Sequence, residues 1–194
     1  EVGLVFQYPE YQLFEETVYK DISFGPKNMK LSDDEIAKRV VSAAAYVGLK
    51  KELLEKSPFD LSGGEKRRAA IAGVIAMQPK VLILDEPTAG LDPIGRDTIL
   101  DMIKNYREKT GSTVLLVSHS MEDVAKIATK VAVMNNARLE MYGTVDEVYS
   151  QAERLREIGL NIPQISKVFE ILKNNGHDFG SVYTVDRAVE VLTR

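Results

Sequence analysis

The sequence predicts an α/β fold, in which helices cover a parallel sheet, with a small helical appendage at the C-terminal end. Two uniformly apolar runs, residues 80–84 and 113–117, lack the alternation of a half-exposed strand and so indicate strands buried on both faces. These runs alternate with segments of helical pattern, which is typical of a parallel sheet. After about Ser150 the sequence predicts helices separated by a loop and contains no catalytic motif. We therefore predict a main domain over residues 1–150 and the appendage over 151–194.

Composition and charge exclude several classes of protein. The chain has 194 residues, of which 44% are hydrophobic and 28% are charged, enough to bury the core of one domain with an appendage. The net charge of -4 gives no reason to expect a nucleic-acid partner. The lack of cysteine excludes disulfides and thiolate metal sites. No apolar run approaches the roughly 20 residues that span a bilayer, and no signal peptide is visible.

The first half of the chain predicts a helical subdomain over about residues 15–77. A short apolar strand, Val2–Phe6, and a polar, aromatic loop precede it. Ser32 and Glu35 predict a capping box at the start of one helix. Residues 62–77 contain many small apolar side chains and predict another helix.

The second half continues the alternation of strands and helices. Asp92 and Pro93 predict a helix start, because proline is favoured at the first helical position. Residues 121–129 predict a helix, and 130–142 predict a hairpin around two asparagines. Thr144 predicts a further capping box with the glutamate three residues on.

Polar side chains follow each of the three predicted strands. Gln7 follows the first strand, Asp85 and Glu86 follow the second, and His119 follows the third. Ligands of open α/β sheets bind at the carboxyl ends of the strands. We therefore expect one site at this edge of the sheet.

The apolar run that ends in Asp85 and Glu86 has the form of a Walker B strand. In that interpretation Asp85 holds, through water, the Mg²⁺ that bridges nucleotide phosphates. Glu86 then polarises the attacking water as a general base. The alternative is a buried strand that merely ends in acids at a loop.

A second motif precedes the small-residue helix. Gly63 and Gly64 let backbone N–H groups approach a phosphate, Ser62 can donate its hydroxyl, and the helix points its positive end at the anion. Ser62 and Glu65 also form a capping box, so the segment has an interpretation as a helix start alone. The two roles are compatible, and the spacing to Asp85 favours a functional role.

Three single residues carry weaker signals. His119 would contact the attacking water or the γ-phosphate, although a lone histidine at a strand end is more often a satisfied structural residue. Gln7 would help to hold Mg²⁺ and the water. Asp92 has both a helix-capping and a nucleotide-binding interpretation, which the sequence does not separate.

As a set, these residues resemble the ATP-binding-cassette (ABC) ATPases over residues 1–150. The resemblance implies a P-loop NTPase-like fold, ATP and Mg²⁺ as ligands, and a dimer in which each signature faces the partner's nucleotide. The resemblance also implies that Gln7, Ser62, Gly63, Gly64, Glu65 and Asp92 bind nucleotide. Glu65 departs from the usual glutamine, a mild change that we expect to leave the phosphate contact intact. The motifs occur in family order: Gln7 (Q-loop), residues 61–65 (signature), 81–87 (Walker B), 89–92 (D-loop) and His119 (switch histidine).

Residues 6–18 are similar to the ATPases of energy-coupling-factor transporters, which import vitamins, cobalt, nickel and other micronutrients in prokaryotes. This resemblance implies a peripheral protein on the cytoplasmic face of the cell membrane. Its partners would be a second ATPase subunit, identical or paralogous, a membrane-embedded coupling subunit and a separate substrate-binding membrane subunit. The groove for the coupling subunit would be lined by Tyr8, Tyr11, Leu13 and Phe14, for which local core packing is the alternative.

One expected motif is missing. None of the 13 glycines is followed by lysine, so the sequence has no G-x-x-x-x-G-K-[ST] phosphate loop. The family places that loop upstream of Gln7, so we expect the chain to begin inside the domain. Two alternatives to a transport ATPase stay open: a soluble cassette ATPase without a transport role, and a non-catalytic regulatory subunit. Neither the transported substrate nor the role of 151–194 is given, and dimer contacts are our hypothesis for the latter.

Overall fold

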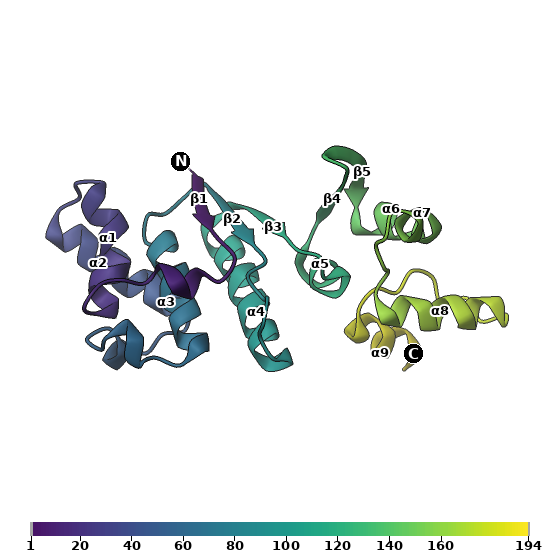
Figure 1. Cartoon of the computed structure of the whole chain (residues 1–194). Helices are drawn as coiled ribbons and strands as arrows, with labels where there is room; N and C mark the ends of the chain where they lie inside the picture. The colour runs from purple at the N-terminus through teal and green to yellow at the C-terminus, as the bar shows by residue number, and fades with distance from the viewer. Residues whose placement is uncertain (1, 194) are drawn as a thin grey trace. The chain divides into compact units, whose positions relative to one another are not determined.

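The computed structural model describes residues 2–193. The chain forms two compact units, residues 1–117 and 118–194, called here the first and second units. Each unit is described by itself. Figure 1 gives the order of the elements along the chain.

The first unit contains a parallel sheet of three strands in the order β1-β2-β3. These are β1 (Val2–Val5), β2 (Val81–Asp85) and β3 (Thr113–Val117). The register aligns Leu4 with Ile83 and Ile83 with Leu115. The parallel arrangement predicted from the apolar runs is therefore confirmed.

One face of this sheet is packed against helices. Val5 and Leu82 are each 1% exposed and Leu84 is fully buried. Gly3 belongs to the same face, where an added Cβ would lie 2.7 Å from Val74 in α3 (Gly63–Ile75). Glycine thus allows β1 and α3 to approach closely.

The opposite face of the sheet remains open within residues 2–193. Val2, Leu4, Leu115 and Val117 alternate with the buried positions and are 41–63% exposed. The uniform apolar runs predicted cover on both faces, but the helices of the described part bury only one. The apolar side chains of β3 on this face are therefore not accounted for by packing within residues 2–193.

The helical part of the first unit lies between β1 and β2. Val18, Ile22, Val40 and Ile71 are fully buried in its core. Besides α3, its elements are η1 (Pro9–Gln12), α1 (Val18–Asn28), α2 (Asp33–Tyr46), η2 (Lys51–Leu53) and η3 (Pro58–Asp60).

Local signals set the helix ends in this unit, with one difference from expectation. The side chain of Ser32 accepts a hydrogen bond from the Glu35 N–H at 3.4 Å. The Glu35 carboxylate pairs instead with Arg39 at 2.7 Å, so only half of the predicted capping box forms. Helix α4 (Pro93–Thr110) starts where Asp92 and Pro93 predicted and ends at Gly111, which has a φ of 66°.

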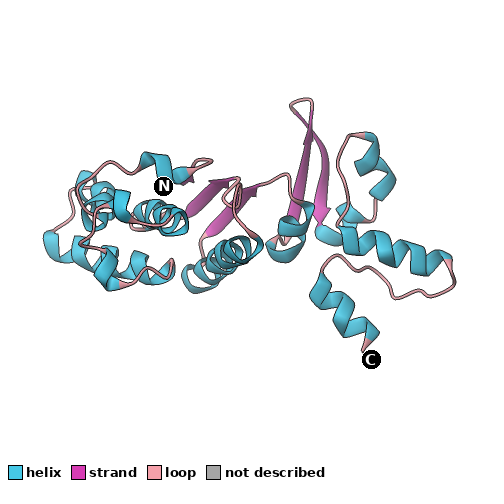
Figure 2. Ribbon diagram, turned by 60° about the horizontal axis from the view of Figure 1, so that its bottom comes forward, coloured by secondary structure: helices cyan, strands magenta, loops and turns pink. Residues whose placement is uncertain are grey.

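The second unit combines a hairpin with short helices (Figure 2). The antiparallel strands β4 and β5 turn through Asn136 and Ala137, whose φ values of 49° and 60° match a type I′ turn. The predicted capping box of Thr144 and Glu147 is present in full. The elements are α5 (Met121–Ile127), β4 (Lys130–Asn135), β5 (Arg138–Thr144), α6 (Val145–Tyr149), α7 (Ala152–Glu157), α8 (Gln164–Asn174) and α9 (Val185–Leu192).

The core of the second unit crosses residue 150. Val148, Tyr149, Ala152 and Leu155 belong to one buried cluster with the hairpin, and the Tyr149 hydroxyl donates to the Met121 carbonyl at 2.9 Å. The boundary between the two compact units therefore lies at 117/118, whereas the composition of the sequence changes near residue 150. The domain boundary at 150 stays a prediction. No helix within residues 2–193 has the length and apolar character needed to cross a bilayer.

Candidate functional site

The first unit brings three predicted site residues to the carboxyl edge of its sheet. Gln7 follows β1, Asp85 is the last residue of β2, and Glu86 comes next. Gln7 is exposed, and both carboxylates are half-buried. Because neighbouring parallel strands end at the same edge, these groups share the position at which such sheets bind ligands.

The backbone of Glu86 has an unusual conformation. Its φ of 46° lies in the left-handed region, which is unfavourable for a residue with a Cβ. Two hydrogen bonds hold it there: its N–H donates to the Val117 carbonyl at 2.9 Å, and its carbonyl accepts from the Ala89 N–H at 3.1 Å. Strain held in place by surrounding structure is common at functional sites.

The oxygen donors at this edge fit a Mg²⁺ ion that is shared with a phosphate ligand. Mg²⁺ takes oxygen ligands, keeps several waters, and is usually held by one or two carboxylates plus substrate phosphates. Among the described residues there is no group of three or more His, Asp or Glu that would form an all-protein cation site. Asp85 and the amide oxygen of Gln7 are thus suited to contribute one or two ligands, with phosphates and water supplying the rest.

The signature segment starts α3 through a complete capping box. The Glu65 N–H donates to the Ser62 hydroxyl oxygen at 3.4 Å, and the Glu65 carboxylate accepts from the Ser62 N–H at 2.9 Å and from its hydroxyl at 2.7 Å. The hydrogen bond from the Ser62 hydroxyl lowers the pKa of Glu65 most, and the bond from the Ser62 N–H lowers it further. The Ser62 hydroxyl must rotate away from Glu65 before it can donate to a phosphate.

The glycines of this segment have no internal steric reason to be glycine. A Cβ added at Gly63 would meet nothing within 4 Å, and one added at Gly64 would meet only the Arg68 side chain, at 3.7 Å. Neither residue has a positive φ. The missing side chains therefore fit the close approach of a group from outside the chain.

Asp92 is engaged as a helix cap. Its carboxylate accepts a hydrogen bond from the Gly95 N–H at 2.9 Å. A Cβ at Gly95 would lie 2.7 Å from that carboxylate oxygen, so glycine makes room for the cap. The capping role left open by the sequence is thus present, and the nucleotide-binding role of Asp92 stays a prediction.

Aromatic side chains project from the segment that follows Gln7. Tyr8, Tyr11 and Phe14 are 40%, 85% and 59% exposed, whereas Leu13 is only 9% exposed. Leu13 therefore supports this surface from the core and is not available to line it. Phe24 of α1, 45% exposed, packs edge-on against Phe14 at 5.0 Å and was missed from the sequence. We call Tyr8, Tyr11, Phe14 and Phe24 the aromatic surface.

A buried carboxylate fixes the chain beneath this surface. Asp21 in α1 accepts hydrogen bonds from the backbone N–H groups of Phe14 and Glu15, at 3.3 and 3.2 Å. Burial raises the pKa of Asp21 despite these two bonds. Its role was missed from the sequence, because an aspartate inside a helix looks like an ordinary surface residue.

His119 lies in the second unit, two residues beyond the end of β3, and is exposed. The first unit thus brings together Gln7, Asp85 and Glu86, and His119 is outside it. Its contact with the γ-phosphate or the water stays a prediction.

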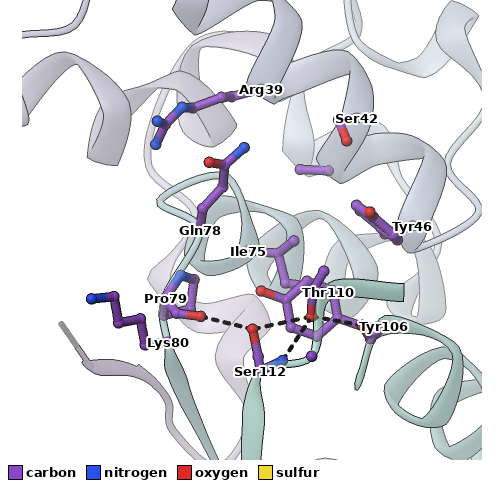
Figure 3. Close-up of a pocket in the computed structure, with 12 residues that line it drawn as sticks. Arg39, Ser42, Tyr46, Ile75, Gln78, Pro79, Lys80, Tyr106, Thr110 and Ser112 are labelled. Carbon is purple, nitrogen blue, oxygen red and sulfur yellow. Dashed lines mark hydrogen bonds between the residues drawn. The ribbon is translucent and has the colours of Figure 1, made fainter. Parts of the chain in front are cut away.

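A cavity of about 550 Å³ lies at the other end of the sheet (Figure 3). Lys80 and Ser112, which precede β2 and β3, line it together with Arg39, Tyr46 and Tyr106. The Ser112 hydroxyl donates to the Pro79 carbonyl at 3.0 Å. Because it is at the amino ends of the strands, this cavity is separate from the candidate site.

The protein belongs to the class of ABC ATPases. This class is defined by the sheet edge, the signature helix and the motifs between them. The ABC transporter family pattern matches residues 1–89. Among solved structures, cbiO1 from Clostridium perfringens, described as part of the ABC transporter complex cbiONQ, is 43% identical with a TM-score of 0.72, covering 87% of this chain and 67% of that one. A dimeric bacterial ABC transporter cassette is 27% identical with a TM-score of 0.63, covering 75% of this chain and 63% of that one.

Curated relatives narrow the class further. The energy-coupling factor transporter ATP-binding protein EcfA2 of Caldanaerobacter subterraneus subsp. tengcongensis is 55% identical over 100% of this chain and 68% of its own length. EcfA2 of Clostridium perfringens is also 55% identical, over 98% of this chain and 68% of its own length. The chain belongs to the family of energy-coupling factor transporter ATP-binding proteins, and its function is that of the ATP-binding subunit of such a transporter.

These comparisons confirm the predicted family, fold class and ATP-binding role. They also set aside the alternative of a cassette ATPase without a transport role. The contributions of single residues are not tested by them and stay predictions.

Proposed function

We propose that this chain hydrolyses ATP within an energy-coupling-factor transporter and so drives the uptake of micronutrients, vitamins or metal ions. The observation that carries the proposal is the conformation of Glu86. A strained, left-handed backbone at the end of a buried strand presents this carboxylate at the ligand-binding edge of the sheet.

In this proposal the chain's residues divide the chemistry among them. Glu86 accepts a proton from the water that attacks the γ-phosphate. Asp85 and Gln7 hold Mg²⁺, which when bound neutralises charge on the phosphates. His119 contacts the γ-phosphate or the attacking water, and Asp92 contributes to the nucleotide site beside its role as a helix cap.

The signature segment serves a nucleotide bound by a second ATPase subunit, identical or paralogous. Ser62, Gly63 and Gly64 lie at the start of α3, where backbone N–H groups and the helix dipole favour an anion. Glu65 stabilises the start of that helix by accepting from Ser62. The empty space around Gly63 supports the proposal that a phosphate approaches this segment from outside the chain.

The aromatic surface contacts a membrane-embedded coupling subunit. Exposed rings at one end of a sheet suit a helix that lies in a groove, and Tyr11 and Phe14 offer such rings. The ATPase is then held at the cytoplasmic face of the cell membrane as a peripheral subunit. A separate membrane subunit binds the transported substrate.

The test is Glu86→Gln in the assembled transporter. Loss of the base should reduce ATP turnover by about 10²-fold or more, while ATP binding is retained and the nucleotide stays trapped. Asp101→Asn, an exposed carboxylate change on α4, is the matched control and should keep the parent rate. Turnover of Glu86→Gln at the parent rate would remove Glu86 as the base and favour a non-catalytic subunit.

A further inference from the structure

Arg67 is a charged residue buried inside the first unit, in the helix that starts with the signature. Its side chain is 3% exposed. Its Nε and Nη2 groups donate to the two carboxylate oxygens of Glu10, at 3.0 and 2.7 Å. Its Nη1 group donates to the carbonyls of Pro87 and Ala89, at 3.2 and 2.7 Å. One guanidinium thus holds two segments, at Glu10 and at 87–89, that are far apart in the sequence.

These partners belong to two different functional segments. Glu10 lies in η1, which follows Gln7 and carries Tyr11 of the aromatic surface. Pro87 and Ala89 lie in the turn 87–90 that follows Glu86. Arg67 itself is two residues beyond Glu65. The guanidinium therefore joins the Q-loop segment, the signature helix and the backbone next to the proposed base.

A second contact connects the same two segments. Gly90 has a φ of 73°, and a Cβ added there would lie 3.6 Å from Cε1 of Tyr8, so the tyrosine ring lies against the turn. The Arg67 guanidinium carbon is 5.8 Å from the centroid of the same ring. The Q-loop segment and the turn after Glu86 are thus held together by a ring contact as well as by Arg67.

The chemistry of the pair suits a rigid connection. A guanidinium bonds a carboxylate through two parallel hydrogen bonds in a fixed plane, and a lysine cannot reproduce that geometry. Burial would raise the pKa of Glu10, but the hydrogen bonds and the charge of Arg67 outweigh it and hold that pKa below its usual value. The pair is therefore ionised at neutral pH.

The turn transmits this connection to Glu86. The Ala89 carbonyl accepts from Arg67, while the Ala89 N–H donates to the Glu86 carbonyl at 3.1 Å. Pro87, whose carbonyl also accepts from Arg67, is bonded directly to Glu86. Displacing the guanidinium would release both ends of the turn that helps to keep Glu86 in its left-handed conformation.

We propose that Arg67 is a positioning residue that ties the aromatic surface to the backbone of Glu86. A partner that moves Tyr11 and Phe14 would then move the proposed base with them. This inference rests on the proposed function for the role of Glu86, whereas the connection between the two segments does not depend on that role.

The connection is tested first without reference to activity, by amide hydrogen exchange in the assembled transporter. Arg67→Lys keeps the charge but loses the paired geometry, and we expect exchange to accelerate about tenfold in both segments, 8–13 and 85–92. Exchange in residues 36–47 of α2 serves as an internal check against general unfolding. Arg39→Lys, the same change at a guanidinium that pairs with Glu35 at 2.7 Å on α2, is the matched control and should leave both segments unchanged. Unchanged exchange in Arg67→Lys, or acceleration confined to one segment, overturns the proposal.

Kinetics then test the consequence for the base. Arg67→Lys should lower kcat by about tenfold or more, because misplacing a reacting group is costly, while the KM for ATP changes by no more than about threefold. An unchanged kcat with accelerated exchange overturns the positioning role. If Glu86→Gln keeps the parent turnover while Arg67→Lys loosens both segments, the proposed function fails and the connection stands. If Glu86→Gln abolishes turnover and exchange is unchanged, the connection fails and the function stands.

Discussion

At the scale of single residues, the candidate site depends on two groups whose positions are enforced by their surroundings. Glu86 keeps a left-handed backbone because the end of β3 and the following turn both bond to it. Arg67 keeps a buried charge because a carboxylate and two carbonyls accept from it. In both cases the local preference of the residue is overcome by hydrogen bonds, of which at least one comes from a partner far away in the sequence.

The Arg67–Glu10 pair predicts a specific pH dependence of stability. The folded-state pKa of Glu10 lies below its usual 4.5, so the ionised carboxylate contributes stability that is fully present above 4.5 and is lost as pH falls through the lower folded-state value. The free energy of unfolding should therefore differ most between the parent chain and Glu10→Gln near neutral pH, and the difference should shrink at pH values below 4.5. Urea denaturation across this range measures it.

The double variant provides the control for this prediction. With Arg67→Met as the background, Glu10 has no guanidinium to lower its pKa. Glu10→Gln should then no longer reduce stability at neutral pH. A difference between parent and Glu10→Gln that stays constant down to strongly acidic pH would contradict the assignment of the stabilisation to the ionised pair.

At the scale of elements, α3 combines a capping box with a predicted phosphate contact, and the two functions can be separated at Gly63. A Cβ there meets nothing within 4 Å and the backbone φ is not positive, so the fold tolerates alanine. Alanine also favours a helix by up to about 1 kcal/mol over glycine. We expect Gly63→Ala to leave the melting temperature unchanged or slightly raised, yet to reduce ATP turnover in the assembled transporter, because the methyl group occupies the path of the phosphate.

Gly48→Ala is the matched control for this prediction. Gly48 ends α2 with a φ of 67°, and it also has nothing within 4 Å of an added Cβ. Alanine there should lower stability by about 1 kcal/mol through backbone strain and leave turnover per folded protein unchanged. If Gly63→Ala turns over ATP at the parent rate, the segment is a helix start without a phosphate contact.

The elements also show which parts of the fold are readable from sequence. β2, the cap at Asp92 and the box at Thr144 depend on neighbours within a few residues; the cap and the box were predicted at their observed places, and the strand, expected at 80–84, is found one residue later at Val81–Asp85. The box at Ser32 formed only by half, because Glu35 has a competing partner, Arg39, one turn further along. Local patterns thus identify candidate bonds but do not decide between two partners that are both within reach.

Long-range partners account for most of what the sequence did not predict in the site. The Arg67–Glu10 pair joins residues 57 apart in sequence, and a basic run after the signature gives no sign of which arginine is buried. Leu13 and Phe14 are adjacent, yet one is in the core and the other is exposed, because Asp21 fixes the backbone between α1 and this loop. Burial of single side chains in an irregular loop has no sequence period from which to read it.

At the scale of the whole molecule, the open face of the sheet needs an explanation. Parallel sheets occur almost only with both faces covered, and contiguous exposed apolar surface commonly marks an interaction site. Leu4 and Leu115 align through Ile83 across this face and are 41% and 50% exposed. The exposed positions of β1 and β3, with the half-buried Ile83 between them, therefore form a surface that is suited to burial against further polypeptide.

The residues present in this chain also predict what it does in isolation. Gln7, Asp85 and Glu86 lie at the sheet edge, but none of the 13 glycines is followed by the lysine of a phosphate loop. Such a loop supplies the backbone N–H groups and the lysine that hold the β- and γ-phosphates. The proposed base and metal ligands do not by themselves position the nucleotide, and positioning provides most of the catalysis in phosphoryl transfer. The purified 194-residue chain should therefore bind ATP weakly and show no Mg²⁺-dependent hydrolysis.

Titration calorimetry measures the binding of ATP to the purified chain, and phosphate release measures its hydrolysis, with the assembled transporter as the positive control. Mg²⁺-dependent hydrolysis by the purified chain that disappears in Glu86→Gln would show that the nucleotide is held by groups other than a phosphate loop.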